Sequence, residues 1–376
     1  MSKTHSIGWR RRLVFQLVLI ALTLLAIEGI VRYAACKGVL NIRVYPTISR
    51  SRPIRFLGDL NPHFGAWHRP NASTTVKTPN GNIQHTSNAH GMRDRPRELK
   101  SKASERVVVL GDSFIEGMGV EATNRLTDLL EQWTGVEFLN FGTSGGFGSI
   151  QEWQLYEHLA LSFDHSRVFL FLLPDNDFSD NETPDPSSDR YRPFLQKQDG
   201  LYREAYPFPF DQVQARRQDL PWGRRLRHRI YNHWYTLGVL NDLSFAKAKK
   251  SLRPSSYDVY SEEDLEKLLF TYAQIADLAR PRPLTIFIIP RDTDFAAQEA
   301  GRNEGRIVDA LRAFAAQREG IRIVDLMPGF LACMKERRHS FRPFFLGYDA
   351  HWSPYGHQVA AKIVLENQPD LRRAGP

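Results

Sequence analysis

Three residues in two short segments of this sequence have side chains suited to nucleophilic catalysis. Ser113 follows an apolar run in VVVLGDSFIEGMG (107–119), and Asp349 and His351 lie together in DAHWSPYGH. A serine hydroxyl becomes a good nucleophile when a neutral histidine takes its proton. An aspartate bonded to that histidine holds the correct tautomer and stabilises the imidazolium. These residue types predict acyl transfer with Ser113 as nucleophile, His351 as base and Asp349 as its partner.

Acyl transfer also needs hydrogen-bond donors for the oxyanion that forms on the substrate. The candidates are the backbone N–H of Ser113, a backbone N–H in the glycine-rich segment NFGTSGGFG (140–148), and the side-chain amide of Asn176 in PDNDF. We expect Asp177 to orient the loop after Asn176 rather than to take part in the chemistry. His357 is a weaker candidate base than His351, because it lies where the last predicted helix begins and is expected to pack there.

The glycines around Ser113 do not form a phosphate-binding motif. A P-loop requires GxxxxGK[ST], and the lysine is missing here. GTSGGFG does not fit the dinucleotide fingerprint GxGxxG, and the nucleophile elbow GxSxG is also absent. The histidines are scattered, with no pair at metal-ligand spacing. The sequence therefore predicts no cofactor and no metal site, and leaves serine chemistry without the elbow.

The catalytic candidates follow strands in an alternating pattern of strands and helices. Apolar runs predict strands, and amphipathic stretches predict helices. Fully apolar strands that alternate with helices are typical of a parallel sheet covered on both faces, and ligands bind outside the carboxyl ends of such strands. We therefore predict an α/β protein, a three-layer α/β/α sandwich with a central parallel sheet of about five strands. The predicted strands are 106–110, 136–140, 167–173, 284–289 and 321–326, and the predicted helices are 123–135, 149–161, 261–279, 304–320 and 355–367.

The N-terminal segment has the pattern of a membrane anchor. Three arginines (10–12) precede an apolar run over 13–31, which is interrupted only at Glu28. Nineteen residues make about 28 Å of helix, close to the ~30 Å hydrocarbon core of a bilayer. The arginines favour a cytoplasmic N-terminus. We predict a basic tip and a transmembrane signal-anchor over 1–36, with a cleaved signal peptide and a buried core helix as alternatives.

The rest of the chain divides into an extension and a main domain. Residues 37–104 predict loops and short strands packed on a domain that spans 105–370. An aromatic, loop-rich insertion at about 178–255 is expected to lie over the carboxyl end of the sheet. The net charge of +8 indicates a solvated basic face or an anionic membrane surface, and not a nucleic-acid partner, since no stripe of basic and aromatic residues recurs. Two cysteines match neither a disulfide framework nor a zinc pattern.

Together the four polar segments resemble the signature blocks of the SGNH, or GDSL-type, serine hydrolases. GDSF resembles the block that carries the serine, NFGTSGG the glycine block, PDND the asparagine block and DAHWSPYGH the histidine block. The resemblance covers about 100–370, with the blocks in family order. HTSNAHGMRD (85–94) is also similar to the segment that precedes the serine in membrane-anchored bacterial members.

The resemblance implies a flavodoxin-like fold and the same triad of Ser113, His351 and Asp349. It also implies an oxyanion hole formed by Ser113, Gly145 and Asn176, with Gly142 and Gly146 as alternatives for the glycine. Two positions depart from the family pattern. Pro174 replaces the usual glycine of the asparagine block, and Asp349 lies two residues before the histidine where many members have three.

These observations predict an exported serine esterase, anchored in the bacterial inner membrane, with its catalytic domain in the periplasm. The resemblance suggests ester-linked acyl groups as substrates, namely O-acetyl groups on carbohydrate or lipid-like esters. The aromatic insertion could provide a sugar-stacking or acyl-binding wall. An O-acyltransferase in envelope or exopolysaccharide modification has the same triad and remains an alternative. A catalytically silent envelope-binding protein is the other alternative.

Overall fold

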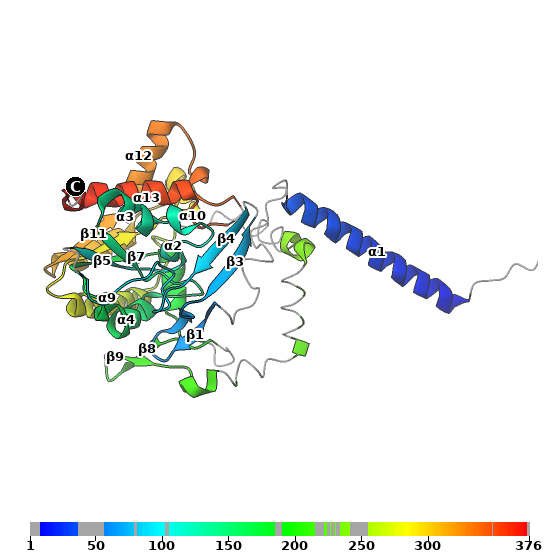
Figure 1. Ribbon diagram of the computed structural model, residues 1–376, viewed down its shortest axis with the longest axis horizontal. Coiled ribbons are helices and arrows are strands. Elements are labelled where there is room, and N and C mark those ends of the chain that lie inside the picture. The colour runs from blue at the N-terminus through cyan, green and yellow to red at the C-terminus, as the bar shows by residue number, and fades with distance from the viewer. Residues whose placement is uncertain are drawn as a thin grey trace, which may run out of the picture.

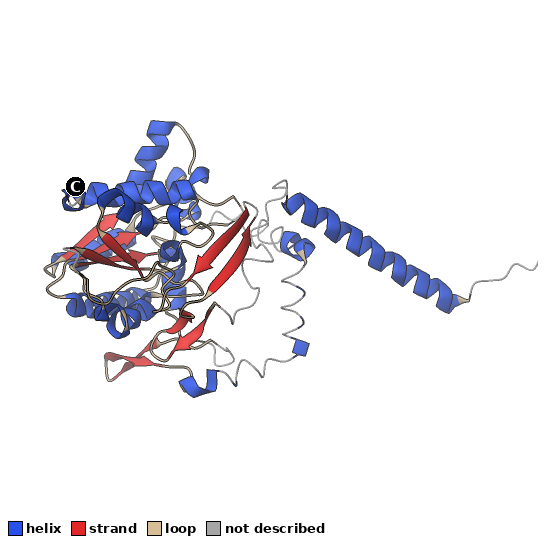
Figure 2. Cartoon of the chain, in the orientation of Figure 1, coloured by secondary structure: helices blue, strands red, loops and turns tan. Residues whose placement is uncertain are grey.

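The computed structural model consists of an α/β body and one long helix that projects from it (Figures 1 and 2). It describes residues 8–36, 56–78, 81–101, 105–184, 190–213, 234–240, 255–347 and 349–373, with a few isolated positions between 215 and 230. The projecting helix is α1 (Trp9–Cys36), and its apolar side chains are exposed. Parts of the predicted extension (37–55) and of the predicted insertion (241–254 and shorter stretches) lie outside the described residues.

Within the described residues, five parallel strands form the central sheet, in the order β11-β10-β7-β5-β6. Each strand begins and ends within two residues of its predicted position, so the predicted parallel sheet is confirmed. In chain order the arrangement is 2-1-3-4-5, which reverses direction at β5, between β6 and β7. Such a switch point opens a crevice at the carboxyl ends of the strands. The five strands are β5 (Arg106–Leu110), β6 (Glu137–Asn140), β7 (Arg167–Leu172), β10 (Leu284–Ile288) and β11 (Ile321–Asp325).

Helices cover both faces of this sheet, as predicted. Alternate strand residues point to opposite sides, so Val108 and Leu110 enter one core while Val107 and Val109 enter the other. The first face is covered by α4 (Ser149–His158), α9 (Glu262–Ala279) and α11 (Arg306–Ala316), and the second by α3 (Leu126–Thr134), α12 (Met327–Arg337) and α13 (Pro354–Asn367).

In the part of the chain that the structure describes, three antiparallel hairpins and several short helices surround this sandwich. The hairpins pair β1 (Leu57–Asn61) with β2 (Gly65–His68), β3 (Ser73–Thr78) with β4 (Gly81–Thr86), and β8 (Phe194–Gln198) with β9 (Leu201–Ala205). The short α-helices are α2 (Ser113–Glu116), α5 (Pro174–Asp180) and α10 (Asp292–Glu299). The 3₁₀ turns are η1 (Ala122–Asn124), η2 (Ala160–Ser162), η3 (Phe210–Gln212), η4 (Arg342–Phe344) and η5 (Pro369–Arg373).

Aromatic side chains of the insertion pack on the N-terminal hairpin β1–β2. The Tyr191 hydroxyl donates a 2.7 Å hydrogen bond to the carbonyl of Pro62, and the Tyr206 hydroxyl donates to the carbonyl of His63. The two tyrosine rings stack on each other, with centroids 5.2 Å apart. The described part of the insertion therefore uses these aromatic groups to join itself to the extension.

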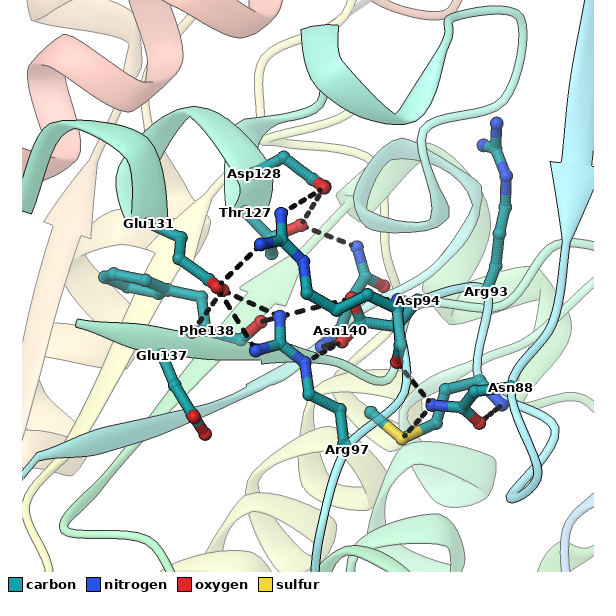
Figure 3. A network of polar contacts seen from close by, with 12 residues as sticks. Asn88, Arg93, Asp94, Arg97, Thr127, Asp128, Glu131, Glu137, Phe138 and Asn140 are labelled. Carbon is teal, nitrogen blue, oxygen red and sulfur yellow. Dashed lines mark hydrogen bonds and ion pairs between the residues drawn. The ribbon is translucent and has the colours of Figure 1, made fainter. Parts of the chain in front are cut away.

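A buried network of charges fastens the end of the extension to the sheet (Figure 3). Arg97 donates to Asp94 at 2.9 Å and to Glu131 of α3 at 2.7 Å, and it also bonds the carbonyl of Phe138. Asp94 accepts the backbone N–H of Asn140 at the end of β6. The Arg97 side chain is only 4% exposed. One guanidinium therefore joins the extension, α3 and the edge strand.

Arg97→Ala is expected to lower the free energy of unfolding by about 3–5 kcal/mol, because it leaves the buried Asp94 carboxylate without its main charge partner. Arg95→Ala is the matched control. Arg95 contacts Asp128 and Glu131, but its side chain is 52% exposed, so we expect a loss of at most about 1 kcal/mol. Urea unfolding followed by tryptophan fluorescence measures both changes, and equal losses in the two variants would contradict the assignment.

Candidate active site

Ser113 is the first residue of a one-turn helix at the carboxyl end of β5, at the switch point of the sheet. The helix α2 forms because Asp112 caps it, with Oδ1 accepting the N–H of Phe114 at 2.9 Å. It ends at Gly117, which adopts φ of 80° and returns its N–H to the carbonyl of Ser113. The turn thereby places the hydroxyl of Ser113 at the carboxyl end of β5.

Asp349 and His351 reach the same place from the loop before α13. Phe345 pairs with Trp352 in an isolated antiparallel bridge, and the N–H of Leu346 donates to the carbonyl of His351 at 2.9 Å. Trp352 is fully buried and anchors the loop in the core. Next to it, Ser353 caps α13 by accepting the N–H of Gly356. The loop is therefore held on both sides of the histidine.

The three side chains form one chain of hydrogen bonds. Nε2 of His351 lies 2.7 Å from Oγ of Ser113, and Nδ1 of His351 lies 2.8 Å from Oδ1 of Asp349. A carboxylate only accepts, so Nδ1 carries the proton and Nε2 is left to accept the serine hydroxyl proton. The side chains of His351 and Asp349 are 22% and 23% exposed, which leaves the group open to a substrate.

The charges of this pair set the proton affinity of the imidazole. Burial disfavours the imidazolium, but the adjacent Asp349 carboxylate outweighs it and raises the pKa of His351 above its ordinary value of 6.5. Burial also opposes ionisation of Asp349, and the contact with His351 outweighs it and lowers the pKa of that carboxyl. The pair is thus arranged to stabilise an imidazolium once His351 has taken a proton.

Asn176 lies beside the nucleophile turn, at the start of α5. Its Nδ2 donates to Oδ2 of Asp112 at 3.3 Å, so the amide is adjacent to the residue that precedes Ser113. Pro174 is the first residue of α5, where its missing N–H costs nothing and its fixed φ suits a helix. The proline that departs from the family pattern therefore helps to start the helix that carries Asn176.

The glycine loop after β6 runs along the nucleophile turn. The N–H of Thr143 donates to the carbonyl of Gly111 at 3.2 Å. A Cβ on Gly142 would lie 2.2 Å from the backbone N of Glu116, so only glycine allows this approach. The N–H of Gly142 already donates to Oδ1 of Asn140 at 2.9 Å, which removes it from the oxyanion candidates.

Gly145 and Gly146 remain as donors from this loop. Gly145 adopts φ of 95° and Gly146 φ of 73°, a region that favours glycine. Among the described residues, no acceptor engages the N–H of either glycine. Arg190, from the insertion, donates to the carbonyl of Gly145 and fixes the orientation of the following peptide.

Glu116 is a buried positioning residue that the sequence analysis missed. Its Oε2 accepts the N–H of Ser144 at 2.6 Å, and its Oε1 lies 3.2 Å from Nε2 of His68 and 3.7 Å from Nδ1 of His85. Burial opposes its ionisation, but contacts with the two histidines outweigh it and lower the pKa of Glu116 well below its usual value. The only sequence signal was an acidic residue three positions after Ser113, in an apolar turn.

The buried carboxyls of Asp112, Glu152 and Asp177 lie close enough to influence one another. Asp177 accepts the N–H of Leu173 at 2.8 Å, so it orients the start of α5 and not, as expected from the sequence, a loop after Asn176. Glu152 of α4 has no hydrogen-bond partner among the described residues. Burial raises the pKa of Asp177 and of Glu152 well above their ordinary values, and that of Asp112 as well. Such groups are expected to keep their protons rather than carry buried charge.

Other candidates do not reach the site. His357 is buried against Trp352, with ring centroids 5.5 Å apart, and burial lowers the pKa of His357 to about 3. Within the part of the chain that the structure describes, no group of three or more His, Cys, Asp or Glu side chains is arranged to hold a metal ion. The arrangement at the switch point is therefore one of a serine, a histidine and an aspartate, with an amide beside them.

Glu152→Gln is expected to raise the free energy of unfolding at pH 8 and to leave it nearly unchanged at pH 4. The pKa of Glu152 in the folded protein lies above its ordinary value of 4.5, so the unfolded chain loses this proton first. Wild-type stability then falls by about 1.4 kcal/mol per pH unit between the two pKa values. Urea unfolding at both pH values measures the change. Glu157→Gln, on the exposed side of α4, is the control, and a benefit of equal size at both pH values would contradict the prediction.

No protein-family model and no curated protein matches this chain. Solved structures that are similar to it include a member of the lipolytic protein G-D-S-L family from Veillonella parvula, with 14% identity, 70% of this chain and 97% of that chain covered, and a TM-score of 0.37. An α/β hydrolase enzyme from the metagenome of Lake Arreo, Spain, is 16% identical to this chain and has a TM-score of 0.40. The match covers 73% of this chain and 99% of that chain. A carbohydrate esterase family 2 enzyme with a carbohydrate-binding domain, from Corynascus thermopiles, is 10% identical to this chain and has a TM-score of 0.39. The match covers 73% of this chain and 68% of that chain. At these TM-scores the likenesses carry no argument for what this chain does.

Proposed function

We propose that this protein is a serine esterase of the SGNH type, which hydrolyses ester-linked acyl groups through an acyl-enzyme on Ser113. The observation that carries the proposal is the unbroken hydrogen-bond chain from Ser113 through His351 to Asp349. It lies at the switch point of a parallel sheet, where α/β proteins bind their ligands. Asn176, whose amide bonds the Asp112 side chain next to Ser113, supplies the amide donor in this proposal.

The reaction follows from the roles of these groups. Oγ of Ser113 attacks the acyl carbonyl as its proton passes to Nε2 of His351. The N–H of Ser113, the N–H of Gly145 and the amide of Asn176 stabilise the oxyanion. The C–O bond to the alcohol breaks, and the alcohol leaves with the proton from His351. Water then attacks the acyl-enzyme by the same route, gives its proton to His351 and releases the acid, with Ser113 reprotonated.

The proposed substrates are O-acetyl groups on carbohydrate, or lipid-like esters. This part of the proposal rests on the resemblance of the four polar segments to the SGNH-type blocks. The side chains of His351 and Asp349 are 22% and 23% exposed, which is compatible with an ester carried on a larger molecule. An acyltransferase that passes the acyl group to a sugar hydroxyl would use the same serine, histidine and aspartate. Product analysis with an activated acetyl ester, with and without an oligosaccharide acceptor, distinguishes acyl transfer from hydrolysis.

The proposed location is the outer side of a membrane, with α1 as an uncleaved anchor. Residues Trp9–Ala34 are long and apolar enough to span a bilayer, although a signal sequence meets the same criterion. Arginines 10–12 precede the apolar run and favour a cytoplasmic N-terminus. In a bacterium this orientation places the α/β body in the periplasm, bound to the inner membrane.

Ser113→Ala is expected to abolish labelling by a fluorophosphonate probe and to lower kcat for p-nitrophenyl acetate by at least about 10⁴-fold, because the attacking oxygen is lost. Ser162→Ala, an exposed serine outside the site, serves as the control and should label and turn over like wild type. Gel fluorescence and initial rates provide the two measurements. Labelling that persists in Ser113→Ala would disprove the assignment of the nucleophile.

The kcat/KM of the wild-type protein is expected to fall tenfold per pH unit below the pKa of His351, which lies above 6.5, because the imidazolium cannot accept the serine proton. Asp349→Asn removes the charge that raises this pKa, so the inflection should move to lower pH. The rate should also fall, by about 10⁴-fold, since the tautomer is no longer fixed. A pH–rate profile measures both effects, and an inflection at the same pH in both proteins argues against Asp349 as the partner.

A further inference from the structure

The apolar helix α1 makes a specific polar contact with the insertion. Glu28 is the one acidic residue in the sequence of α1. Its Oε1 accepts the N–H of Tyr235 at 2.7 Å, and its Oε2 accepts the N–H of Thr236 at 2.9 Å and the hydroxyl of Thr236 at 2.7 Å. One turn further on, the guanidinium of Arg32 lies 5.0 Å from the centre of the Tyr235 ring. One face of α1 is therefore fitted to this segment.

If α1 spans a membrane, the contact of Glu28 with Tyr235 and Thr236 lies inside the hydrocarbon core, where carboxyl and backbone N–H groups need hydrogen-bond partners. From Leu13, the first residue after the arginines, to Glu28 is about 22 Å of helix, less than the ~30 Å thickness of the hydrocarbon core. Glu28 of a membrane-spanning α1 is then below the outer boundary of the core. An acidic residue deep in a bilayer is unfavourable unless it has a partner, and backbone N–H groups there must be bonded within the protein. The pairing of Glu28 with two such N–H groups meets both requirements at once.

The segment that meets Glu28 is apolar. Residues 235–240, with the sequence YTLGVL, are helical and carry no charge. In Figure 1 this short light-green helix lies beside the end of α1 that is nearest to the α/β body. Tyr235 is buried, but Leu240 is 56% exposed. Among the described positions just before it, Trp222, Leu226 and Ile230 are also exposed. The exposed Leu240 belongs to the segment that Glu28 holds beside α1.

We propose that residues 234–240 form a second membrane-embedded element, a short helix in the outer leaflet that Glu28 of the anchor caps. The inference rests on the proposed membrane span of α1 and goes beyond it, because an anchor alone places no part of the insertion in the bilayer. The occupant of the exposed surface is the lipid bilayer, since the bonds to Glu28 bring the segment to the depth of the acyl chains. The insertion thereby holds the esterase against the membrane surface.

Depth-dependent quenching tests this proposal on the full chain in lipid nanodiscs. A bimane fluorophore is attached to single cysteines introduced by Leu240→Cys, Leu201→Cys and Leu19→Cys, with Cys36 and Cys333 replaced by serine. Leu201 is the matched control, because it is 66% exposed at the tip of the β8–β9 hairpin. Nitroxide-labelled lipids should quench the fluorophores at positions 240 and 19, and leave the one at 201 unquenched.

The outcomes separate the two proposals. Quenching at position 19 without quenching at position 240 would overturn the membrane-embedded insertion and keep the anchor. Absence of quenching at position 19 would overturn the anchor, and the second element with it. Quenching at positions 19 and 240, with none at 201, supports both.

A substitution of Glu28 tests the cap itself. Glu28→Leu keeps α1 apolar, so quenching at position 19 should be unchanged, while quenching at position 240 falls toward that at 201. Glu28→Gln retains one acceptor oxygen and should lose less. Hydrolysis of soluble p-nitrophenyl acetate should remain at the wild-type rate in both variants, which checks that the α/β body is intact. Full quenching at position 240 in Glu28→Leu would overturn the role of the cap.

Discussion

The buried carboxylate of Glu116 joins the parts of the chain that must meet for the site to exist. It ends the helix that Ser113 begins, it accepts the N–H of Ser144 from the glycine loop, and it contacts His68 and His85 from two hairpins of the extension. Burial lowers the pKa of His85 to about 4, so this imidazole is neutral at physiological pH and its contact is a dipolar one. This carboxylate is thus one acceptor shared by the nucleophile turn, the glycine loop and the extension, in addition to the backbone contacts between them, such as that of Thr143 with Gly111.

The order of the strands explains why the candidate catalytic groups converge. β5 lies between β6 and β7, so the turns after these three strands open side by side although long helical connections separate them in sequence. The first turn carries Ser113, the second carries the glycines and the third carries Asn176. The fourth group, His351, comes from much further along the chain and depends on Trp352 to fix its loop in the core. The strand order therefore brings together Ser113, the glycine loop and Asn176, whereas the packing of Trp352 brings His351 to them.

The sequence predicted the elements whose signals are local. Five-residue apolar strands and amphipathic helices such as α3, which ends at Gly135, are of this kind. The helix α12 was missed because Pro328 and Gly329 in its first turn hide the apolar period. The contacts of Glu116 with His68 and His85, and the buried position of Glu152, were missed because they depend on tertiary packing. A glutamate in SIQEWQLYEH looks like a surface residue until α9 covers it.

Position 142 can hold only glycine while the site keeps its present geometry. A side chain there would collide with the backbone of Ile115 and Glu116, and backbone atoms cannot turn aside as a flexible side chain can. The restriction comes from the space between two loops and not from backbone torsion, so no change of conformation at the glycine relieves it. Any residue larger than glycine at this position would therefore have to push the nucleophile turn and the glycine loop apart.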